Sequence, residues 1–495
     1  MGARTGAELL AGMKGPREVW LGNDRVEDVT QHPALTGTAH KLAAFFDLQH
    51  EAAEDCLFPD PETGELINVS HMIPGSKEDI KRRHRGIRQV AEKSIGVLGR
   101  TPDYKNVAFA GFAGCTHEWG AYGNEAGAER MVNYQKHLRR NDVLLTHTLV
   151  NASTDRSKGD GLTPDGDVAL HKVCDTEHGI IVSGARLLAT LGPFADEIAV
   201  YPSAPLPPNT PEKYVLSFCL PVGTPGLKFL CRDSYASGPN QFDYPLSSRF
   251  DEQDAFVIFD NVEVPRERLF IDGNLAVYNS VTRESWRANV MQQTSIRAQT
   301  KLEFAWGLAS AMMESIGDRS PYSQQKLGEI WAYAALTRAA LTAAEEGARE
   351  WAPGSGVWFC DPDPFWSLTP LMTEWMPRVG ELIRQLGSHN LLAAPSWHMF
   401  QQPSLRPAID KYLEGAEGTN AERRARLFRL AWDFVGSGLA SRGDLYERFY
   451  LGSGGRAYQS IQRRSDRTRA NRLVEQFLSE PVFPAEAVAP LAKAS

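Results

Sequence analysis

Apolar residues recur with helical spacing through the C-terminal part of the chain. After residue 280 they fall three and four positions apart in three segments, residues 302–316, 327–341 and 368–386, which predicts amphipathic helices. Pro370 and Pro377 are expected to start or kink the last helix, because proline has no backbone N–H for a helix interior. The run Thr-Asn-Ala-Glu at 419–422 has the form of a capping box and predicts another helix, with Thr419 as its N-cap. Together these segments predict a C-terminal bundle.

The centre of the chain follows a different pattern. Short runs rich in β-branched and aromatic residues alternate there with Gly, Pro, Asp and Asn. The runs cover residues 179–182, 199–201, 214–218, 227–230 and 255–259. Their spacing predicts an antiparallel sheet or barrel and argues against alternating β–α units. The proline-rich segment 205–211 cannot pair as a central strand and is predicted to be an exposed loop.

The first 150 residues have mainly helical character, with helix-like spacing at Leu42, Ala43, Phe46 and Leu48. The order of helices, sheet and helices predicts an α+β chain that is mostly α. We expect three interdependent parts. They are an N-terminal helical domain over 1–150, a central β-barrel or sheet domain over 151–275, and a C-terminal helical bundle with its tail over 276–495.

Charge and composition exclude several classes. The 495 residues carry 53 Lys and Arg against 61 Asp and Glu, so the net charge is 53 − 61 = −8, unfavourable for sequence-independent binding of nucleic acid. The longest uncharged stretch, between Arg384 and Arg406, is too polar to span a membrane. The N-terminal residues lack the apolar core of a signal peptide. Six scattered cysteines form no C-x-x-C, so no zinc or redox motif is expected. These features predict a cytoplasmic protein with no metal, nucleic-acid or membrane partner.

Common catalytic signatures are missing from the sequence. No Gly-x-Gly-x-x-Gly follows a predicted strand, and there is no Walker A, His-Glu-x-x-His or Gly-x-Ser-x-Gly motif. Gly452, Ser453 and Gly454 by themselves indicate a turn. The polar segment 243–252, between two predicted strands, fits either a cofactor-facing loop or a salt-bridged structural turn.

Three side chains are candidates for chemistry. His147 has mostly apolar neighbours, so its imidazole is expected to be desolvated or held by a specific partner. Arg100 and Tyr104 flank Pro102 in a predicted turn, where a guanidinium and a phenol can together bind an oxyanion or a phenolate. On the residues alone, an ordinary structural histidine and an arginine bonded to a loop backbone are the favoured interpretations.

Seven stretches in order resemble the large oxygenase component of two-component, flavin-dependent phenol hydroxylases of the 4-hydroxyphenylacetate 3-monooxygenase type. They are residues 28–34, 99–105, 147–151 with 155–156, 179–190, 243–252, 260–265, and 444–447 with 452–453. The resemblance implies an acyl-CoA-dehydrogenase-like fold, with N-terminal helices, a central β domain and a C-terminal bundle. It also implies a homotetramer built as a dimer of dimers.

The same resemblance implies a reaction. A separate NAD(P)H:flavin reductase supplies reduced FAD, which agrees with the missing dinucleotide motif. Reduced FAD and O₂ form a C4a-hydroperoxide, whose distal oxygen is attacked by the ring carbon ortho to a phenol hydroxyl, giving a catechol. A group must accept or stabilise the phenol proton, and water must be kept out. The expected substrate is 4-hydroxyphenylacetate or a related 4-substituted phenol, free or tethered to a carrier protein.

Site residues follow from the resemblance position by position. Arg100, Tyr104 and His147 correspond to positions that hold the substrate hydroxyl, and Ser203 is expected to contact the remote end of the substrate. Positions corresponding to flavin contacts are His147, Thr148, Leu149, Ser153, Thr154, Asp155, Arg156, Thr190, Gly452, Ser453 and Gly454. Residues 111–119 and 203–213 depart from the 4-hydroxyphenylacetate pattern, so the identity of the phenol stays open.

Three alternatives remain at this point. A 4-hydroxybutyryl-CoA dehydratase type shares the fold but needs thiolates for an iron–sulfur cluster. That family has two cysteines where this chain has Arg100 and Tyr104, and no cysteine lies between Cys231 and Cys360. An acyl-CoA dehydrogenase would hold FAD tightly and use a catalytic glutamate near the C-terminus. A helical scaffold without enzymatic activity would bind no flavin.

Overall fold

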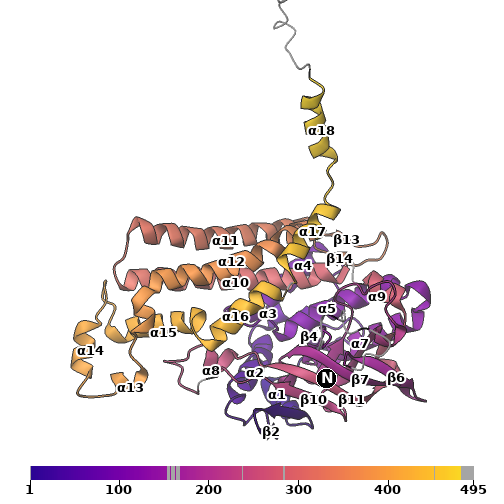
Figure 1. Ribbon diagram of the computed structural model, residues 1–495, viewed down its shortest axis with the longest axis horizontal. Coiled ribbons are helices and arrows are strands. Elements are labelled where there is room, and N and C mark those ends of the chain that lie inside the picture. The colour runs from indigo at the N-terminus through magenta and orange to yellow at the C-terminus, as the bar shows by residue number, and fades with distance from the viewer. Residues whose placement is uncertain are drawn as a thin grey trace, which may run out of the picture.

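The computed structural model describes residues 2–152, 157, 162, 168–236, 238–281, 285–450 and 452–480. It has a helical N-terminal part, a β region and a long helical bundle. Figure 1 shows the bundle lying across the sheets, with N-terminal helices between the two. This order of helices, sheets and helices confirms the predicted fold class.

The N-terminal part is built mainly from helices. They are α1 (Gly6–Met13), α2 (Thr36–Glu51), α3 (Ala53–Cys56), α4 (Lys77–Lys93), α5 (Pro102–Gly114), α6 (Thr116–Trp119) and α7 (Glu125–Asn141), with a small hairpin of β3 (Leu57–Pro59) and β4 (Leu66–Asn68). Helix α5 is buried along nearly its whole length, because it packs against α7 on one side and the bundle helix α10 on the other. Its first residue is Pro102, which suits this position because the first turn has no acceptor for its missing N–H.

Two sheets form the β region. The larger one has the strand order β2-β1-β10-β11-β7-β6 and the smaller one β12-β9-β8-β5. The bounds of the first set are β1 (Glu18–Leu21), β2 (Asp24–Val26), β6 (His171–Asp175), β7 (Gly179–Thr190), β10 (Leu227–Cys231) and β11 (Asp254–Pro265). Those of the second are β5 (Leu145–His147), β8 (Glu197–Val200), β9 (Leu216–Pro221) and β12 (Leu269–Asp272). Phe218 and Phe259 pack edge to face, with centroids 6.0 Å apart, in the core between the sheets. The sequence left either a sheet or a barrel open for this part of the chain, and the described strands form two sheets.

Each of the five strands predicted for the centre of the chain overlaps an observed strand, namely β7, β8, β9, β10 and β11. Strands β1 and β5 come from the first 150 residues and pair with the central strands β10 and β8, and β2 pairs with β1 at the edge of the larger sheet. The predicted domain boundaries at 150 and 275 stay predictions. The exposed loop predicted at 205–211 follows β8 as expected.

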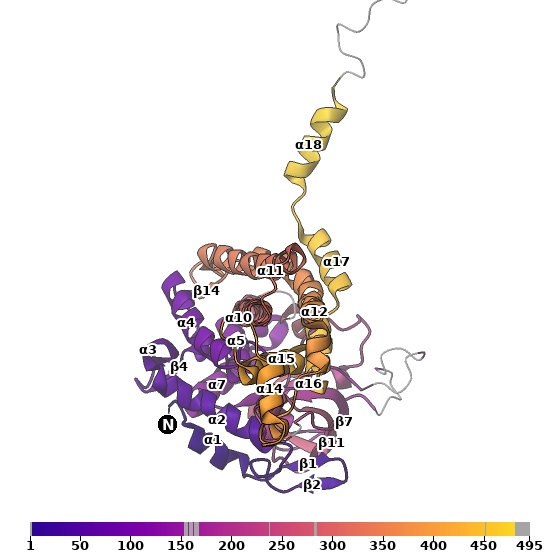
Figure 2. The same cartoon turned by 90° about the vertical axis from the view of Figure 1, so that its left-hand side faces the viewer.

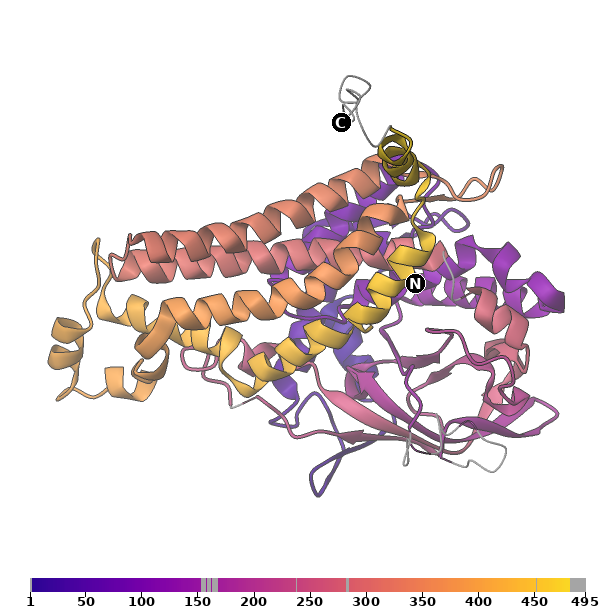
Figure 3. The ribbon, with the colours of Figure 1, turned by 45° about the horizontal axis from the view of Figure 1, so that its top comes forward.

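The bundle consists of long helices that lie side by side in Figure 3. Its helices are α10 (Ser285–Ser315), α11 (Pro321–Glu346), α12 (Pro362–Leu392), α15 (Ala421–Val435) and α16 (Gly438–Phe449). Shorter elements around them are α8 (Ser247–Phe250), α9 (Leu275–Val281), α13 (Trp397–Phe400), α14 (Arg406–Tyr412), β13 (Arg349–Glu350) and β14 (Trp358–Phe359). The three predicted long helices are confirmed as α10, α11 and α12.

Neither Pro370 nor Pro377 starts the last of these long helices, and the predicted N-cap of the helix after it is wrong. Helix α12 begins at Pro362, where Asp361 provides the cap, and it continues through Pro370 and Pro377. The N-cap of α15 is Asn420, whose side chain accepts a hydrogen bond from the Arg423 backbone N at 2.8 Å, so Thr419 lies one residue outside. Asparagine caps a helix at least as well as threonine does, which explains the shift.

The last described helices leave the body of the molecule. Helix α17 (Gly454–Arg464) packs on α12, whereas α18 (Thr468–Leu478) projects outward in two perpendicular views (Figures 1 and 2). Among the helices of the described chain, none is both long and apolar enough to cross a membrane.

Candidate active site

The start of α5 is held close to the bundle helix α16. A Cβ atom added at Gly99 would lie 2.2 Å from the Tyr446 ring, so only glycine fits this close approach. Directly after it, the Arg100 backbone N donates to Glu252 Oε1 at 2.6 Å. The first turn of α5 is therefore fixed from both the β region and the bundle.

Arg100 lies among aromatic rings. Its guanidinium donates a hydrogen bond to the Tyr446 hydroxyl. Its Cζ lies 4.1 Å from the Tyr104 ring centroid, 5.2 Å from that of Tyr446 and 5.4 Å from that of Tyr450. Burial opposes the charge on Arg100, but the tyrosines around it raise its pKa above the ordinary value, so it remains a cation. Its buried Nε has no hydrogen-bond partner among the described residues.

Tyr104 and His147 stack beside this guanidinium. Their ring centroids are 6.2 Å apart and the planes differ by 20°. Their exposed fractions are only 6% and 8%. Burial, and then the neighbouring Lys105 amine and Arg100 guanidinium, hold the pKa of His147 well below its ordinary value. The imidazole is therefore neutral near pH 7 and can accept a proton. The structure thus brings the three predicted substrate residues together.

Two more residues belong to this centre and are not among those predicted. Lys105 donates a hydrogen bond to the Tyr201 hydroxyl, and both side chains are buried. The Tyr201 ring lies 5.8 Å from that of His147. Lys105 has no local signal, since a lysine near the start of a helix normally indicates an exposed face. Tyr201 lies just beyond β8, and nothing in its sequence context indicates the site.

The predicted flavin positions have different surroundings. The Thr148 side chain is fully buried, and its Oγ1 has no hydrogen-bond partner in the described chain. The Leu149 carbonyl accepts from Arg186 at 2.7 Å. Thr190 Oγ1 donates to Asp254 Oδ1 at 2.8 Å, so this hydroxyl already has a protein partner.

The remaining predicted flavin positions are residues 452–454 and four residues that lie outside the described part of the chain, namely Ser153, Thr154, Asp155 and Arg156. Gly452 and Ser453 are exposed just before α17, and Gly454 begins that helix. No hydrogen bond within the described ranges joins residues 452–454 to Arg100, Tyr104 or His147.

Ser203 is connected to the group of Arg100, Tyr104 and His147 by Arg287. Its carbonyl accepts a hydrogen bond from Arg287 Nη2 at 3.3 Å, and Tyr104 is close enough to affect the pKa of Arg287, which burial lowers. The proline-rich loop is anchored by Asn279, which makes hydrogen bonds of 2.8 Å and 3.0 Å to the Leu206 backbone. The loop that carries Ser203 is therefore held against α9 and α10.

A network of ion pairs supports the centre from behind. Arg442 binds Glu252 at 2.6 Å and Asp254 at 2.7 Å, joining α16 to the β region. Arg297 and Glu447 form a bidentate pair with both contacts at 2.9 Å, joining α16 to α10. The sequence left two interpretations open for residues 243–252, a cofactor-facing loop or a salt-bridged structural turn. The end that carries Glu252 is part of a salt-bridged turn.

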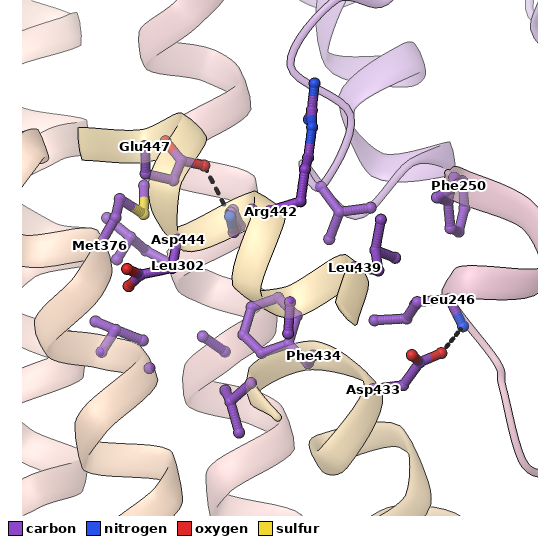
Figure 4. Close-up of a pocket in the computed structure, with 18 of the residues that line it drawn as sticks. Leu246, Phe250, Leu302, Met376, Asp433, Phe434, Leu439, Arg442, Asp444 and Glu447 are labelled. Atoms are coloured by element: carbon purple, nitrogen blue, oxygen red, sulfur yellow. Dashed lines mark hydrogen bonds and ion pairs between the residues drawn. The ribbon is translucent and has the colours of Figure 1, made fainter. Parts of the chain in front are cut away.

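Figure 4 shows a separate cavity beneath α16, with Arg442 and Glu447 on its wall. Its volume is about 60 Å³, whereas small-molecule sites measure roughly 300–1,000 Å³. The cavity can hold water but neither a flavin nor a phenol. Arg442 is one of the residues that line it, and its guanidinium pairs with Glu252, whose Oε1 accepts a hydrogen bond from the Arg100 backbone N.

The buried polar atoms without partners suit a planar cofactor with a polar edge. In addition to Thr148 Oγ1 and Arg100 Nε, the described chain leaves Asn151 Oδ1 and Arg186 Nε without hydrogen bonds. Buried polar atoms are nearly always satisfied in a working protein, and the ring oxygens and nitrogens of a flavin can supply these partners. Among the described residues, no cluster of three His, Cys, Asp or Glu side chains is arranged to hold a metal ion.

Comparison with known proteins agrees with this geometry. The family model 4-hydroxyphenylacetate 3-hydroxylase N terminal matches residues 5–271, and the corresponding C-terminal model matches residues 279–479. The chain is 38% identical to the 4-hydroxyphenylacetate 3-monooxygenase oxygenase component of Thermus thermophilus, over 97% of this chain and 98% of that protein. It is 32% identical, over 91% of this chain and 85% of the relative, to a Streptomyces globisporus monooxygenase acting on a carrier-bound 3-chloro-4-hydroxyphenyl substrate.

A solved structure is similar over almost the entire fold. It is the crystal structure of the oxygenase component of 4-hydroxyphenylacetate 3-monooxygenase in complex with FAD and 4-hydroxyphenylacetate. The TM-score is 0.90 and the sequence identity 37%, covering 96% of this chain and 98% of the other. The two family models together span most of the sequence. The chain therefore belongs to the 4-hydroxyphenylacetate 3-hydroxylase family.

Proposed function

We propose that this chain is the oxygenase component of a two-component phenol 3-monooxygenase. It hydroxylates a 4-substituted phenol ortho to the hydroxyl group and gives a catechol, using O₂ and reduced FAD from a separate NAD(P)H:flavin reductase. The observation that carries the proposal is the buried grouping of Arg100, Tyr104 and His147, in which a cation and a neutral imidazole lie together. The family membership supports the same activity.

Each residue has a separate part in this chemistry. Bound FAD supplies the activated oxygen. The Arg100 guanidinium attracts and orients the phenol oxygen, because it carries a permanent charge. His147 is neutral, and it accepts a hydrogen bond from the phenol O–H. The buried rings of Tyr104 and Tyr201 exclude water, which limits the wasteful release of H₂O₂.

The flavin is expected to lie along the end of β5. Thr148 and the backbone around Leu149 provide polar groups there, and Arg186 lies beside them. Thr190 acts from the neighbouring strand, where Asp254 orients it. Ser153, Thr154, Asp155, Arg156 and residues 452–454 remain proposed contacts on the basis of the family resemblance.

The phenol is proposed to be 4-hydroxyphenylacetate or a close relative, with its remote end near Ser203. A carrier-bound phenol is the second candidate, because the loop that follows Ser203 is exposed and the Streptomyces relative acts on such a substrate. Product formation with free phenols separates the two candidates.

We also propose that the chain assembles as a homotetramer in the cytoplasm. Helix α18 projects from the body (Figure 2), its residues Leu473, Val474, Phe477 and Leu478 are exposed, and exposed apolar residues of this kind favour contact with another subunit. All six cysteines are free thiols, as expected in a reducing compartment.

The activity test combines the chain with FAD, NADH, a generic flavin reductase and a panel of phenols. The expected result is an ortho-hydroxylated product, detected by mass spectrometry. His147→Ala should lose this product while H₂O₂ continues to form, and His178→Ala, an exposed histidine on the β region, serves as the matched control. If no phenol is oxygenated while reduced flavin binds, the proposal is wrong.

A further inference from the structure

Lys105 is an unusual component of the site, because a lysine is almost never fully buried without an anionic partner. Its exposed fraction is 2%, as is that of its hydrogen-bond partner Tyr201. Its Nζ lies 4.4 Å from the Tyr104 ring centroid and 4.8 Å from that of Tyr201. Within the described part of the chain, no carboxylate is close enough to act on it. The amine thus points into a pocket of aromatic rings.

The groups around Lys105 come from several elements. Arg100 precedes α5, His147 lies on β5, and Cys219 lies on β9. Burial and then the Arg100 charge lower the pKa of Lys105 well below its ordinary value, and the Cys219 thiol opposes this only in part. Without a bound anion, the Lys105 side chain is therefore held toward its neutral amine form. A neutral amine can accept a proton.

Ordinary acidities decide which base is better matched to a phenol. A phenol such as the tyrosine side chain has a pKa of about 10, a lysine about 10.4 and a histidine about 6.5. By these ordinary values an amine is a stronger base than an imidazole by about 4 pKa units. Both bases are buried in the same pocket, so this difference favours the amine. The ion pair that results would also supply Lys105 with its missing anion.

We propose that Lys105, held by the Tyr201 hydroxyl, receives the proton of the bound phenol, so that the substrate is held as the phenolate. The phenol O–H bond breaks, Tyr201 takes up this proton and passes its own to Lys105, and a new N–H bond forms on Nζ. The site neither gains nor loses charge. His147 accepts the hydrogen bond of the neutral phenol O–H when the substrate binds, and after the proton has moved to Tyr201 the Arg100 guanidinium pairs with the phenolate. This inference rests on the proposed function and adds the ionisation state of its substrate.

The test measures the ionisation of a bound phenol directly. A ring-fluorinated 4-hydroxyphenylacetate is added to the chain with reduced FAD under nitrogen, where nothing turns over, and its ¹⁹F shift is followed against pH. In the wild type the bound phenol should ionise at least one pH unit below the free phenol. Lys105→Met should raise this midpoint by at least one unit, a tenfold change in the phenolate-to-phenol ratio. Tyr201→Phe should change it in the same direction.

A surface variant and a proton count complete the design. Lys228→Met, which removes a lysine on β10 that pairs with Asp260 on β11, should leave the midpoint unchanged. Calorimetry in two buffers should show that the wild type binds the phenol without releasing a proton to solvent. Lys105→Gln, which keeps a polar group beside Tyr201, replaces the Met variant if that variant does not fold.

The possible outcomes separate a failure of the Lys105 inference from a failure of the proposed function. If Lys105→Met and Lys105→Gln bind the phenol with the wild-type midpoint, the inference about Lys105 is overturned and the proposed function stands. If the wild-type chain binds no phenol with or without reduced FAD, both are overturned. A raised midpoint in the Lys105 variants together with an unchanged surface control supports the inference.

Discussion

The Tyr446 hydroxyl accepts a hydrogen bond from the Arg100 guanidinium, although the two residues are 346 positions apart in the sequence. The contact joins the last bundle helix before the tail to the first turn of α5. The residue proposed to bind the phenol oxygen is thus positioned by the bundle. Any change in how α16 packs is expected to reach the site through this bond.

Removing the Tyr446 hydroxyl should therefore weaken catalysis. A hydrogen bond to a charged group contributes about 1.5–3 kcal/mol, so Tyr446→Phe should lower kcat/KM for the phenol by roughly tenfold or more. Steady-state product formation is the measurement. Tyr458→Phe, which removes an exposed hydroxyl on α17, is the control. Equal activity of both variants would exclude Tyr446 from the positioning of Arg100.

The close approach at Gly99 predicts an interaction between two substitutions. Gly99→Ala places a Cβ 2.2 Å from the Tyr446 ring, so α5 or α16 must move and activity should fall sharply. In a Tyr446→Ala background the same substitution should cost much less, because the clash is gone. Activities and unfolding free energies of the four proteins of the cycle provide the test. Additive effects would contradict this explanation of Gly99.

Arg442 is predicted to be essential for stability. It pairs with both Glu252 and Asp254 and is mostly buried, so Arg442→Met leaves Glu252 without its ion-pair partner and Asp254 with Arg232 alone. Loss of one partner from a buried ion pair costs about 3–5 kcal/mol. Urea unfolding should show this loss, and Arg448→Met, at an exposed pair on the same helix, should cost little. A loss below about 1 kcal/mol in the buried variant would match a surface pair and contradict the assignment.

His147 predicts a specific pH dependence of stability. Its pKa is lowered in the folded state, so the unfolded chain binds the extra proton first as pH falls below about 6.5. The unfolding free energy of the wild type should therefore fall with decreasing pH relative to His147→Gln, by up to about 1.4 kcal/mol per pH unit. Above about pH 7 this difference should be independent of pH. Chemical unfolding of both proteins at pH 5, 6, 7 and 8 tests it, and parallel curves throughout would show that His147 titrates normally.

The exposed apolar face of helix α18 predicts that substitutions there change the oligomeric state. Phe477→Asp together with Leu473→Asp places charges on its exposed apolar face. If this face contacts another subunit, native mass spectrometry should show smaller assemblies. Val173→Asp, at an exposed position on β6, should leave the mass distribution unchanged. A tetramer that survives the double substitution would exclude α18 from the interface.

The sequence predicted the long elements better than the contacts between them. Helices α10, α11 and α12 and strands β7 and β11 follow from local periodicity, because each buries one regular face. Strand β5 has three residues and pairs with β8 about fifty residues later, so its position depends on partners that local pattern does not reveal.

In the site, too, the residues that were predicted have a signal in the sequence, and those that were missed are placed by the tertiary fold. Arg100, Tyr104 and His147 were predicted from the family resemblance, and His147 also from its apolar neighbours. Lys105 was missed because a lysine normally indicates an exposed helix face, and only the packing of α5 between α7 and α10 reveals that it is buried. Tyr446 approaches Arg100 through the tertiary fold, which no local spacing encodes.

The central claim is that this chain transfers an oxygen atom from O₂ to a phenol. The most direct measurement is a single turnover with reduced FAD, 4-hydroxyphenylacetate and ¹⁸O₂, followed by mass spectrometry of the product. The account predicts a catechol carrying one ¹⁸O atom in the wild type, and H₂O₂ without catechol in His147→Ala. A wild-type chain that binds reduced FAD and 4-substituted phenols but yields only H₂O₂, or an unlabelled product, would contradict it.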